Sequence, residues 1–333
     1  DLPLAVNPSR EDPSSGILVN TNNKTTDAAF PEHISFDWGD TQRLARATHL
    51  LNARQFHTRD SFIEIQTDVV SNAARLLLPM MAKDLWWAGQ PAATGSYERR
   101  RQQALELLAN WNGEMGEHDP EPLIYAAWIS AFQRRLIIDE LGLLATQFPT
   151  VRVEFLERVL RDKDGASIWC DIRNTTKKET CQDISAAALD EAMLSLSEAY
   201  GDTVTRWRWG YAHQALHESK VLGKIPVVGW FANIRQETPG GDNTLRRGNL
   251  RATGAQPFTN IHGSGYRAVY DFADPDSSVY IIATGQSGHL LSRHYDDLAT
   301  IWRRGEYIPM SLDPTLARGG AVGITHLRPD TAN

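Results

Sequence analysis

The sequence predicts an α+β protein with a helical insertion, and three observations support this fold class. A short apolar segment at residues 17–19 favours a strand near the start of the chain. Residues 41–200 carry mostly helical patterns. After Gly201 the composition shifts towards Gly, Pro, Asn and β-branched residues, which favour turns and strands. Because strands at both ends enclose a helical middle, we expect the two ends to meet in one sheet.

The helical middle contains segments with recognisable boundaries. In residues 62–77, apolar side chains recur at three- and four-residue intervals, which places them on one helical face until Pro79 marks a break. Asp119 can cap a second helix and Pro120 can begin it. Gly201 can end a third helix.

Two strands joined by a turn are predicted near the C-terminal end. Residues 265–272 (GYRAVYDF) and 279–284 (VYIIAT) are rich in aromatic and β-branched side chains. Residues 273–278 between them contain the Asp, Ser and Pro residues typical of turns. We expect these strands to share a β layer with residues 17–22.

The composition argues against several classes of protein. With 41% hydrophobic and 23% charged residues, the 333-residue chain can bury a large core, so disorder describes it poorly. Its 34 basic and 41 acidic residues give a net charge of −7 without a long Lys/Arg block, which argues against nucleic acid as a partner. No apolar run reaches the ~18–20 residues of a membrane span. The polar start at Asp1 does not resemble a signal peptide, so any export signal is expected outside this chain.

The two cysteines, Cys170 and Cys181, are separated by a polar, turn-rich stretch. A loop of that size can close with disulfide geometry, which would point outside the reducing cytoplasm. The alternative is a pair of reduced thiols in a cytosolic protein. A zinc site has less support, because no CxxC pair is present.

Three further motifs contain residues of types that can carry chemistry. His213 and His217 could face one metal if their segment were helical, but Gln214 stands where a zinc protease needs Glu, and packing beside Trp207 and Trp209 is the simpler interpretation. The serine of GQSG at 285–288 lacks the glycine spacing of a nucleophile elbow, so Ser287 is interpreted as a turn residue. GGDNT at 240–244 lacks the Lys of a phosphate loop and is also interpreted as a turn.

An Asn pair follows the predicted N-terminal strand. Asn22 and Asn23 lie at the strand end, and Arg43 occurs five residues after Trp38. A side-chain amide at such a place can donate to a developing oxyanion, and a buried Arg can orient the amide through its carbonyl. An Asn pair taken alone is most often turn chemistry.

Several segments, in order along the chain, resemble the penicillin acylases and their relatives, which include acyl-homoserine-lactone and cephalosporin acylases. The similar segments are residues 16–19, NTNNK at 20–24, FPEHISFDW at 30–38, Arg43, WCDIRNTTKKETC at 169–181, HGSGYRAVYDF at 262–272, GQSG at 285–288 and HYDDLATIWRRGEYIPM at 294–310. Because separated motifs occur in family order, chance agreement is a poor explanation. The resemblance implies the C-terminal portion of the family's large (β) subunit.

The resemblance implies an N-terminal-nucleophile hydrolase fold, with layered antiparallel sheets flanked by helices and a helical subdomain. It also implies hydrolysis of the amide bond of an N-acylated small molecule, such as a penicillin or an N-acyl-homoserine lactone. In that family a Ser exposed by self-cleavage of a precursor begins the β subunit and forms an acyl-enzyme, with its own α-amino group as base. The chemistry needs no cofactor. A periplasmic or otherwise exported location in a bacterium is expected.

The family's functional residues fall on matching positions of this sequence. The oxyanion Asn matches Asn22, with Asn23 as the alternative if the register is one residue out, and the orienting Arg matches Arg43. Family members often hold a structural calcium ion, and Glu32 falls where the family has a carboxylate ligand.

Other positions complete the expected site and its surroundings. Asp242 and His262 could support the site from a greater distance, although no matched motif assigns them a role. The loop at 169–181 resembles a disulfide loop of exported members, so Cys170 and Cys181 are expected to be bonded.

The chain is expected to have three parts. Residues 1–40 form the strand and oxyanion-Asn loop of the catalytic core, and residues 41–235 form a largely helical region with the disulfide loop 170–181. Residues 236–333 form C-terminal strands and a helix that return to the core.

The departure from the family pattern concerns the nucleophile. The chain begins with Asp1 rather than Ser, so the nucleophile, the backbone oxyanion donor and much of the acyl pocket are expected upstream. The chain alone should be inactive. Its expected partners are the α subunit and the N-terminal part of the β subunit of the same precursor. The alternative is a non-catalytic fragment or degenerate paralogue that serves as a structural or binding domain.

Overall fold

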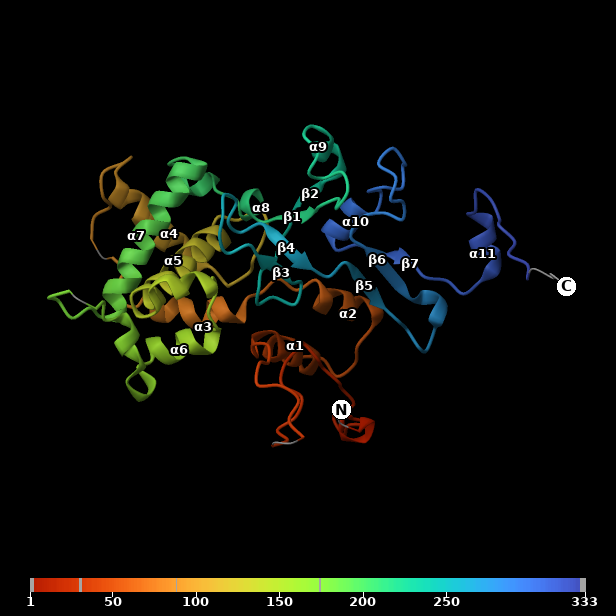
Figure 1. The fold of residues 1–333 in the computed structure, drawn as a ribbon, viewed down its shortest axis with the longest axis horizontal. Helices are drawn as coiled ribbons and strands as arrows, with labels where there is room; N and C mark the ends of the chain where they lie inside the picture. The colour runs from red at the N-terminus through yellow and green to blue at the C-terminus, as the bar shows by residue number, and fades with distance from the viewer. Residues whose placement is uncertain (1–2, 30–31, 88, 174, 330–333) are drawn as a thin grey trace. The chain divides into compact units, whose positions relative to one another are not determined.

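The computed structural model describes residues 3–29, 32–87, 89–173 and 175–329, and the chain forms two compact units (Figure 1). Unit 1 consists of Asp1–Phe56 and Ile65–Ser264. Unit 2 consists of His57–Glu64 and Gly265–Asn333. Each unit contains its own sheet.

Unit 1 is built mainly from helices. Its longer helices are α1 (Gln42–Asn52), α3 (Asn72–Met81), α4 (Tyr97–Asn110), α5 (Glu121–Leu141), α6 (Val153–Leu160) and α7 (Cys181–Tyr200). The shorter ones are α8 (Trp209–Ala212), α9 (Val228–Ala232), η1 (Leu4–Val6), η2 (Gly142–Gln147), η3 (Lys163–Cys170) and η4 (Val204–Arg206). Helix α2 (Arg59–Gln66) crosses the division between the units. No helix among the described residues is both long and apolar enough to span a bilayer.

The core of unit 1 lies where α5 packs against α7. Ile124, Trp128 and Phe132 of α5 are fully buried. The Trp128 indole N–H donates to the carbonyl oxygen of Ser185 on α7 (2.9 Å), so this large side chain also satisfies its one polar atom.

The predicted boundaries of α5 and α7 are confirmed in part. Helix α5 begins directly after Pro120, but Asp119 does not cap it, since no side-chain cap bond is formed there. Helix α7 ends at Gly201, whose φ of 81° is the left-handed backbone that glycine accepts. At its start Thr180 and Asp183 form a capping box that satisfies two backbone N–H groups.

The single helix predicted over residues 62–77 is wrong, because the structure divides it into α2 and α3. Ser71 has extended backbone and its side chain accepts the Ala74 N–H, which begins a new helix in the middle of the apolar period. Val70 beside it forms an isolated bridge with Glu114.

Pro79 does not break α3, which continues to Met81. So close to the helix end, the proline removes one backbone hydrogen bond without stopping the helix.

The sheet of unit 1 has the strand order β2-β1-β4-β3. The strands are β1 (Gln214–His217), β2 (Ile234–Glu237), β3 (Gly248–Leu250) and β4 (Asn260–Gly263). The pairs β1–β2 and β3–β4 are antiparallel, and β1 meets β4 in parallel. The turn between β2 and β3 holds residues 240–244, of which 241–244 line the cavity described below.

Unit 2 contains the predicted hairpin. Strands β5 (Tyr266–Val269) and β6 (Val279–Ile282) pair in antiparallel fashion, with η5 (Pro275–Ser277) in the connection, as the sequence indicated. Strand β7 (Ile308–Pro309), α10 (Ala299–Arg304) and α11 (Pro314–Gly319) complete the unit.

The strand predicted at residues 17–19 is not formed, and the predicted shared β layer is wrong. In the described chain, these residues pair with no other strand, and Leu18 is 60% exposed. The Ile17 N–H donates to the hydroxyl of Ser15 rather than to a neighbouring strand. Residues 17–22 belong to unit 1, whereas the hairpin belongs to unit 2. An apolar run of three residues does not form a strand without a partner to hydrogen-bond with.

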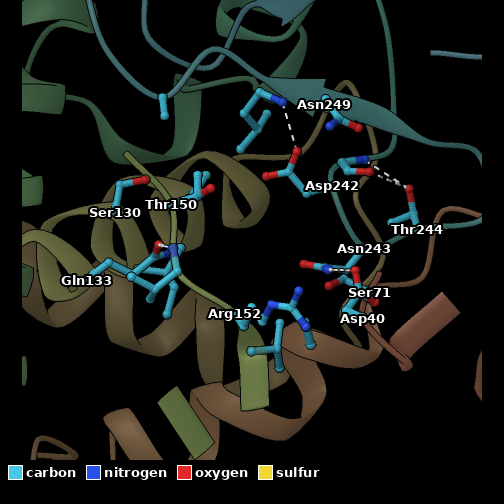
Figure 2. Close-up of a pocket in the computed structure, with 18 of the residues that line it drawn as sticks. Asp40, Ser71, Ser130, Gln133, Thr150, Arg152, Asp242, Asn243, Thr244 and Asn249 are labelled. Atoms are coloured by element: carbon cyan, nitrogen blue, oxygen red, sulfur yellow. Dashed lines mark hydrogen bonds between the residues drawn. The ribbon is translucent and has the colours of Figure 1, made fainter. Parts of the chain in front are cut away.

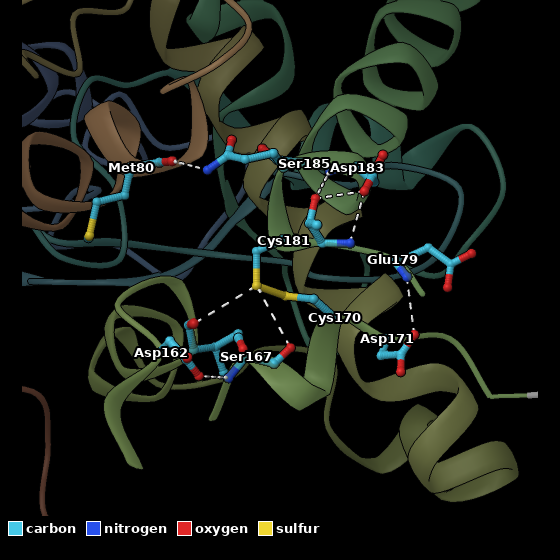
Figure 3. Close-up of a disulfide and its surroundings, with 12 residues drawn as sticks. Met80, Asp162, Ser167, Cys170, Asp171, Glu179, Cys181, Asp183 and Ser185 are labelled. Carbon is cyan, nitrogen blue, oxygen red and sulfur yellow. Dashed lines mark hydrogen bonds between the residues drawn. A yellow bond between two sulfur atoms is a disulfide. The ribbon is translucent and has the colours of Figure 1, made fainter. Parts of the chain in front are cut away.

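The disulfide between Cys170 and Cys181 is present, with a Cα–Cα distance of 5.0 Å (Figure 3). Cys170 ends η3 and Cys181 begins α7. Inside the closed loop, the Glu179 N–H donates to the Asp171 carboxylate (3.1 Å). The bridge therefore fixes the start of the helix that packs on α5.

Removing this bridge should destabilise the protein. For a loop of this length, loss of the cross-link costs about 3 kcal/mol in the chain-entropy model. We expect the Cys170→Ala/Cys181→Ala variant to melt at a lower temperature than wild type. The denatured, unreduced wild type should contain no titratable thiol and the reduced protein two. Two free thiols before reduction would contradict the bond.

Candidate active site

The loop that carries the two asparagines uses their side chains differently. Asn23 is buried, and its Oδ1 accepts from the backbone N–H (3.0 Å) and the hydroxyl (3.3 Å) of Thr21. The Asn23 Nδ2 donates to the carbonyl oxygen of Lys24 (3.0 Å). Both ends of its amide are therefore occupied in holding the turn.

Asn22 is exposed and its amide is held from one end only. Arg43 Nη2 donates to the Asn22 Oδ1 (3.3 Å) and to the carbonyl oxygen of Thr21 (2.6 Å). The Asn22 backbone has a φ of 67°, a left-handed conformation in which Asn is enriched. Because its oxygen accepts from the guanidinium, the Nδ2 of Asn22, which donates to no described residue, remains available as a donor.

Arg43 is a buried residue in the first turn of α1. Burial and the neighbouring charge of Arg247 lower the pKa of Arg43, while Asp40 raises it. The guanidinium nevertheless stays charged at any ordinary pH. It therefore offers the Asn22 carbonyl a fixed, charged donor.

Gly39 holds the other side of the loop. Its N–H donates to the Asn22 carbonyl oxygen (3.1 Å), and a Cβ at this position would lie 2.8 Å from that same oxygen. Only glycine permits so close an approach of the two backbones. The Asn22 backbone is thus fixed by Gly39 and its side chain by Arg43.

A polar contact joins this N-terminal loop to the turn between β2 and β3. The Asn243 Nδ2 donates to Asp40 Oδ2 (3.1 Å), and the Gln42 N–H donates to Asp40 Oδ1 (3.0 Å). Arg247 lies close enough to Arg43 to influence its pKa. The sequence did not mark Asp40, Asn243 or Arg247 as site residues, and no local pattern could have paired residues 203 positions apart.

A cavity of about 560 Å³ lies beside this contact (Figure 2). It is lined by residues 37–40, by one face of α5, by the start of α6, and by residues 241–244, 247 and 249–252. Figure 2 shows Asp242 and Asn243 on the side opposite Ser130 and Gln133. The walls carry both charged groups and apolar side chains.

Asp242 is largely buried at this cavity. Its Oδ1 accepts the Leu250 N–H (2.9 Å). Burial raises the pKa of Asp242 to about 6, although the Leu250 contact and the charge of Arg247 oppose that shift. His262, named with it from the sequence, lies exposed on β4 opposite Asn249 and does not line the cavity, so a role for His262 stays a prediction.

Asp242→Asn should stabilise the protein at pH 8. The folded state holds the Asp242 proton more tightly than the unfolded chain. Protonation of Asp242 therefore adds to the free energy of unfolding. This contribution is fully present below the pKa of the unfolded chain, about 3.9, and is lost as the pH rises through the pKa of the folded state, about 6. The amide keeps the Leu250 contact without the buried charge, so we expect a gain on the order of 1–3 kcal/mol at pH 8 and little change at pH 4. Thermal unfolding of the complete protein at both pH values measures this.

The matched control for that measurement is Asp37→Asn, at a carboxylate whose side chain is 92% exposed. It should alter the melting temperature little at either pH. An equal gain in stability from Asp242→Asn at pH 8 and at pH 4 would contradict the raised pKa of Asp242.

His213 and His217 do not lie on one helix, so the i, i+4 geometry of a shared metal site is not formed. His213 follows α8 and His217 ends β1. The His213 ring is fully buried, stacks on Trp209 (4.5 Å between centroids) and has its Nδ1 2.9 Å from the carbonyl oxygen of Phe258. Burial lowers the pKa of His213 to about 4. The expected packing role beside Trp209 is confirmed, and the helical metal geometry is wrong.

The described part of the chain does not assemble a calcium site by itself. Glu32 is exposed, and no group of three or more His, Cys, Asp or Glu side chains suited to a metal is found among the described residues. The calcium expectation at Glu32 remains a prediction.

The two segments interpreted as turns are turns. The Ser287 hydroxyl accepts the His289 N–H (3.1 Å). The Thr244 hydroxyl accepts the Gly241 N–H (3.0 Å) and donates to the Arg246 carbonyl oxygen (2.8 Å), which closes the GGDNT turn. That turn holds Asp242 and Asn243 at the cavity.

A family model described as penicillin amidase matches residues 2–318 of this sequence. The chain belongs to the penicillin amidase family. Among its relatives, the acyl-homoserine lactone acylase QuiP of Pseudomonas aeruginosa is 25% identical over 93% of this chain and 39% of its own length. The penicillin acylase 2 proenzyme of a Pseudomonas species is 22% identical over 93% of this chain and 38% of its own length.

The fold agrees with this membership. A thermostable penicillin G acylase from Alcaligenes faecalis superimposes with a TM-score of 0.58 at 16% identity, covering 98% of this chain and 59% of that one. The expected family and fold class are therefore confirmed. This penicillin amidase family chain spans 38–39% of the length of the two Pseudomonas acylases.

Proposed function

We propose that this chain is the C-terminal portion of the large subunit of an acylase that hydrolyses the amide bond of an N-acylated small molecule. The observation that carries the proposal is the hydrogen bond from Arg43 to the side-chain oxygen Oδ1 of Asn22. That bond leaves the Asn22 Nδ2 available as a donor. The names of the relatives, acyl-homoserine lactone acylase and penicillin acylase, support an amide substrate.

The proposed role of Asn22 is to stabilise the negative oxygen that forms when a nucleophile attacks the amide carbonyl. The donor must be fixed before the charge develops, because a donor that has to reorient stabilises the transition state less. Arg43 and Gly39 supply that fixation through the side chain and the backbone. Asn23 is a weaker candidate, since its own Nδ2 already donates to Lys24.

The proposed nucleophile is an N-terminal Ser outside this chain, which forms an acyl-enzyme that water then hydrolyses. The proposed partners are therefore the α subunit and the N-terminal part of the β subunit of one precursor. A periplasmic or otherwise exported location is proposed as well, supported by the disulfide between Cys170 and Cys181.

The experiment is to express the complete precursor and measure release of free amine from N-acyl-homoserine lactones and from penicillin G. Mass spectrometry of the quenched reaction should detect an acyl group on the N-terminal residue of the large subunit. No amine release from any N-acyl substrate, with a processed and folded protein, would overturn the proposal. That result would favour the non-catalytic structural or binding role.

A further inference from the structure

The GGDNT turn between β2 and β3 is held to its surroundings from several sides. The fully buried Thr244 closes the turn through its hydroxyl, and the Gly240 N–H donates to the carbonyl oxygen of Met115 (2.8 Å). Just beyond the turn, the Arg246 N–H donates to the carbonyl oxygen of Asp68 (2.9 Å). Because its backbone is tied at both ends, the turn is a fixed support for the side chains that it carries.

Asn243 connects this turn to the start of α1. Its Nδ2 donates to Asp40 Oδ2 (3.1 Å), a bond that Figure 2 shows as a dashed line. Asp40 Oδ1 accepts the N–H of Gln42 (3.0 Å), the first residue of the helix. A carboxylate at this end is also favoured by the helix dipole. Asp40 therefore uses one oxygen on the turn and the other on the helix.

Asp40 lies in the chain between the two residues that hold Asn22. Gly39 donates its N–H to the Asn22 carbonyl oxygen (3.1 Å), and Arg43 donates from Nη2 to the Asn22 Oδ1 (3.3 Å). Burial lowers the pKa of Arg43, and the nearby Asp40 carboxylate opposes that shift, so Asp40 stabilises the positive charge that faces Asn22. A displacement of Asp40 would move both supports of the Asn22 amide.

We propose that Asn243 and Asp40 are positioning residues for the oxyanion donor Asn22. Their hydrogen bond fixes residues 39–43 against the GGDNT turn, and residues 39–43 in turn fix the Asn22 amide. Neither side chain has to touch the substrate. A displacement of about 1 Å in a catalytic group can cost ~10²-fold in rate, so a hydrogen bond at this distance from the reaction can affect it. This inference rests on the proposed function, since it takes Asn22 as the oxyanion donor.

The first test is the kinetics of Asn243→Asp in the complete processed enzyme at pH 8. This variant places a second carboxylate against Asp40, so the two side chains repel each other. We expect kcat on an N-acyl substrate to fall about tenfold or more. KM should change little, because the negative oxygen that Asn22 stabilises forms only in the transition state. If Asn243→Asp does not fold, Asn243→Ala removes the same hydrogen bond without adding a charge and should also lower kcat.

The exchanged pair Asp40→Asn/Asn243→Asp provides the rescue. The amide placed at position 40 can donate to the carboxylate placed at position 243, while its oxygen still accepts the Gln42 N–H. We expect this double variant to recover most of the lost kcat. Glu154→Ala is the matched control, since it removes only an exposed contact with Thr41 at the same helix start (3.4 Å) and should leave kcat unchanged.

Two further measurements distinguish positioning from a general loss of structure. If Asn243 acts through Asn22, Asn243→Asp should lower kcat little further once Asn22→Ala is present, because the donor that it positions is already gone. Hydrogen exchange reports the same coupling without any activity. The Gly39 N–H should exchange faster in Asn243→Asp than in wild type and should regain its protection in the exchanged pair. Circular dichroism checks that each variant is folded.

An unchanged kcat in folded Asn243→Asp would overturn the inference. So would a loss of kcat that adds fully to the loss from Asn22→Ala, or one that the exchanged pair does not recover. If the wild-type enzyme hydrolyses amides and one of these results occurs, only this inference fails. If it hydrolyses no amide, the proposed function fails, and the exchange of Gly39 then decides whether Asn243 fixes the Asn22 loop.

Discussion

Asn22→Ala in the complete enzyme should lower kcat by about 10²–10³-fold, the scale found for loss of one oxyanion donor. The amide matters more in the transition state than in the bound substrate, so kcat should fall and KM should change little. Steady-state kinetics on an N-acyl substrate that the enzyme turns over measures both constants, and circular dichroism checks the fold.

The backbone at this position provides the control. Asn22 has a φ of 67°, which alanine adopts only with strain and glycine adopts freely. If the lost amide is the cause, Asn22→Gly should lose as much activity as Asn22→Ala, whereas an effect of strain would be relieved by glycine. If Asn22→Ala keeps its activity and Asn23→Ala loses it, the oxyanion donor is Asn23 rather than Asn22.

Arg43→Ala should reduce kcat by a similar factor, because the Asn22 amide is then free to rotate and its carbonyl loses a charged donor. Arg43→Lys should recover only part of that loss. One nitrogen of Arg43, Nη2, makes both bonds to Asn22 and Thr21, and a lysine ammonium can donate twice but lacks the rigid planar geometry that fixes their directions. Arg43 acts here as a positioning residue, so its loss should appear in kcat more than in KM.

Arg46 supplies a matched control on the same helix. Its Nη2 pairs with Asp68 Oδ2 (2.6 Å), and both side chains are 12% exposed. Arg46→Ala should lower the melting temperature without the selective loss of kcat. If both arginine variants lose activity only in proportion to their loss of folded protein, the positioning role of Arg43 is refuted.

The sequence predicted those elements whose signals are local. The start of α5 after Pro120 and the end of α7 at Gly201 each depend on the backbone preference of one residue type. The hairpin β5–β6 follows from two β-rich runs around a turn, and the disulfide from two cysteines in one short loop.

Features that depend on distant contacts were missed or misjudged. The sequence at 17–19 is typical of a strand and does not show that a partner strand is absent. The residues around Ser71 do not show whether Ser71 caps a new helix or lies on the polar face of a continuous one. The spacing of His213 and His217 would suit one metal only in a helix, whereas a strand begins at Gln214, directly after His213. The site residues Asn22 and Arg43 follow from family resemblance, whereas Asp40 and Arg247 have no local pattern to mark them.

The hydrogen bond between Asp40 and Asn243 has a consequence for the order in which the chain folds. It joins residues 203 positions apart, while the α5–α7 core and the disulfide join segments much closer in sequence. Contacts between distant residues form late, because closing a long loop costs entropy before any contact compensates it. We therefore expect a refolding chain to acquire its helices and its bridge first. Amide hydrogens of the loop at 20–24 should become protected from exchange only in a later phase.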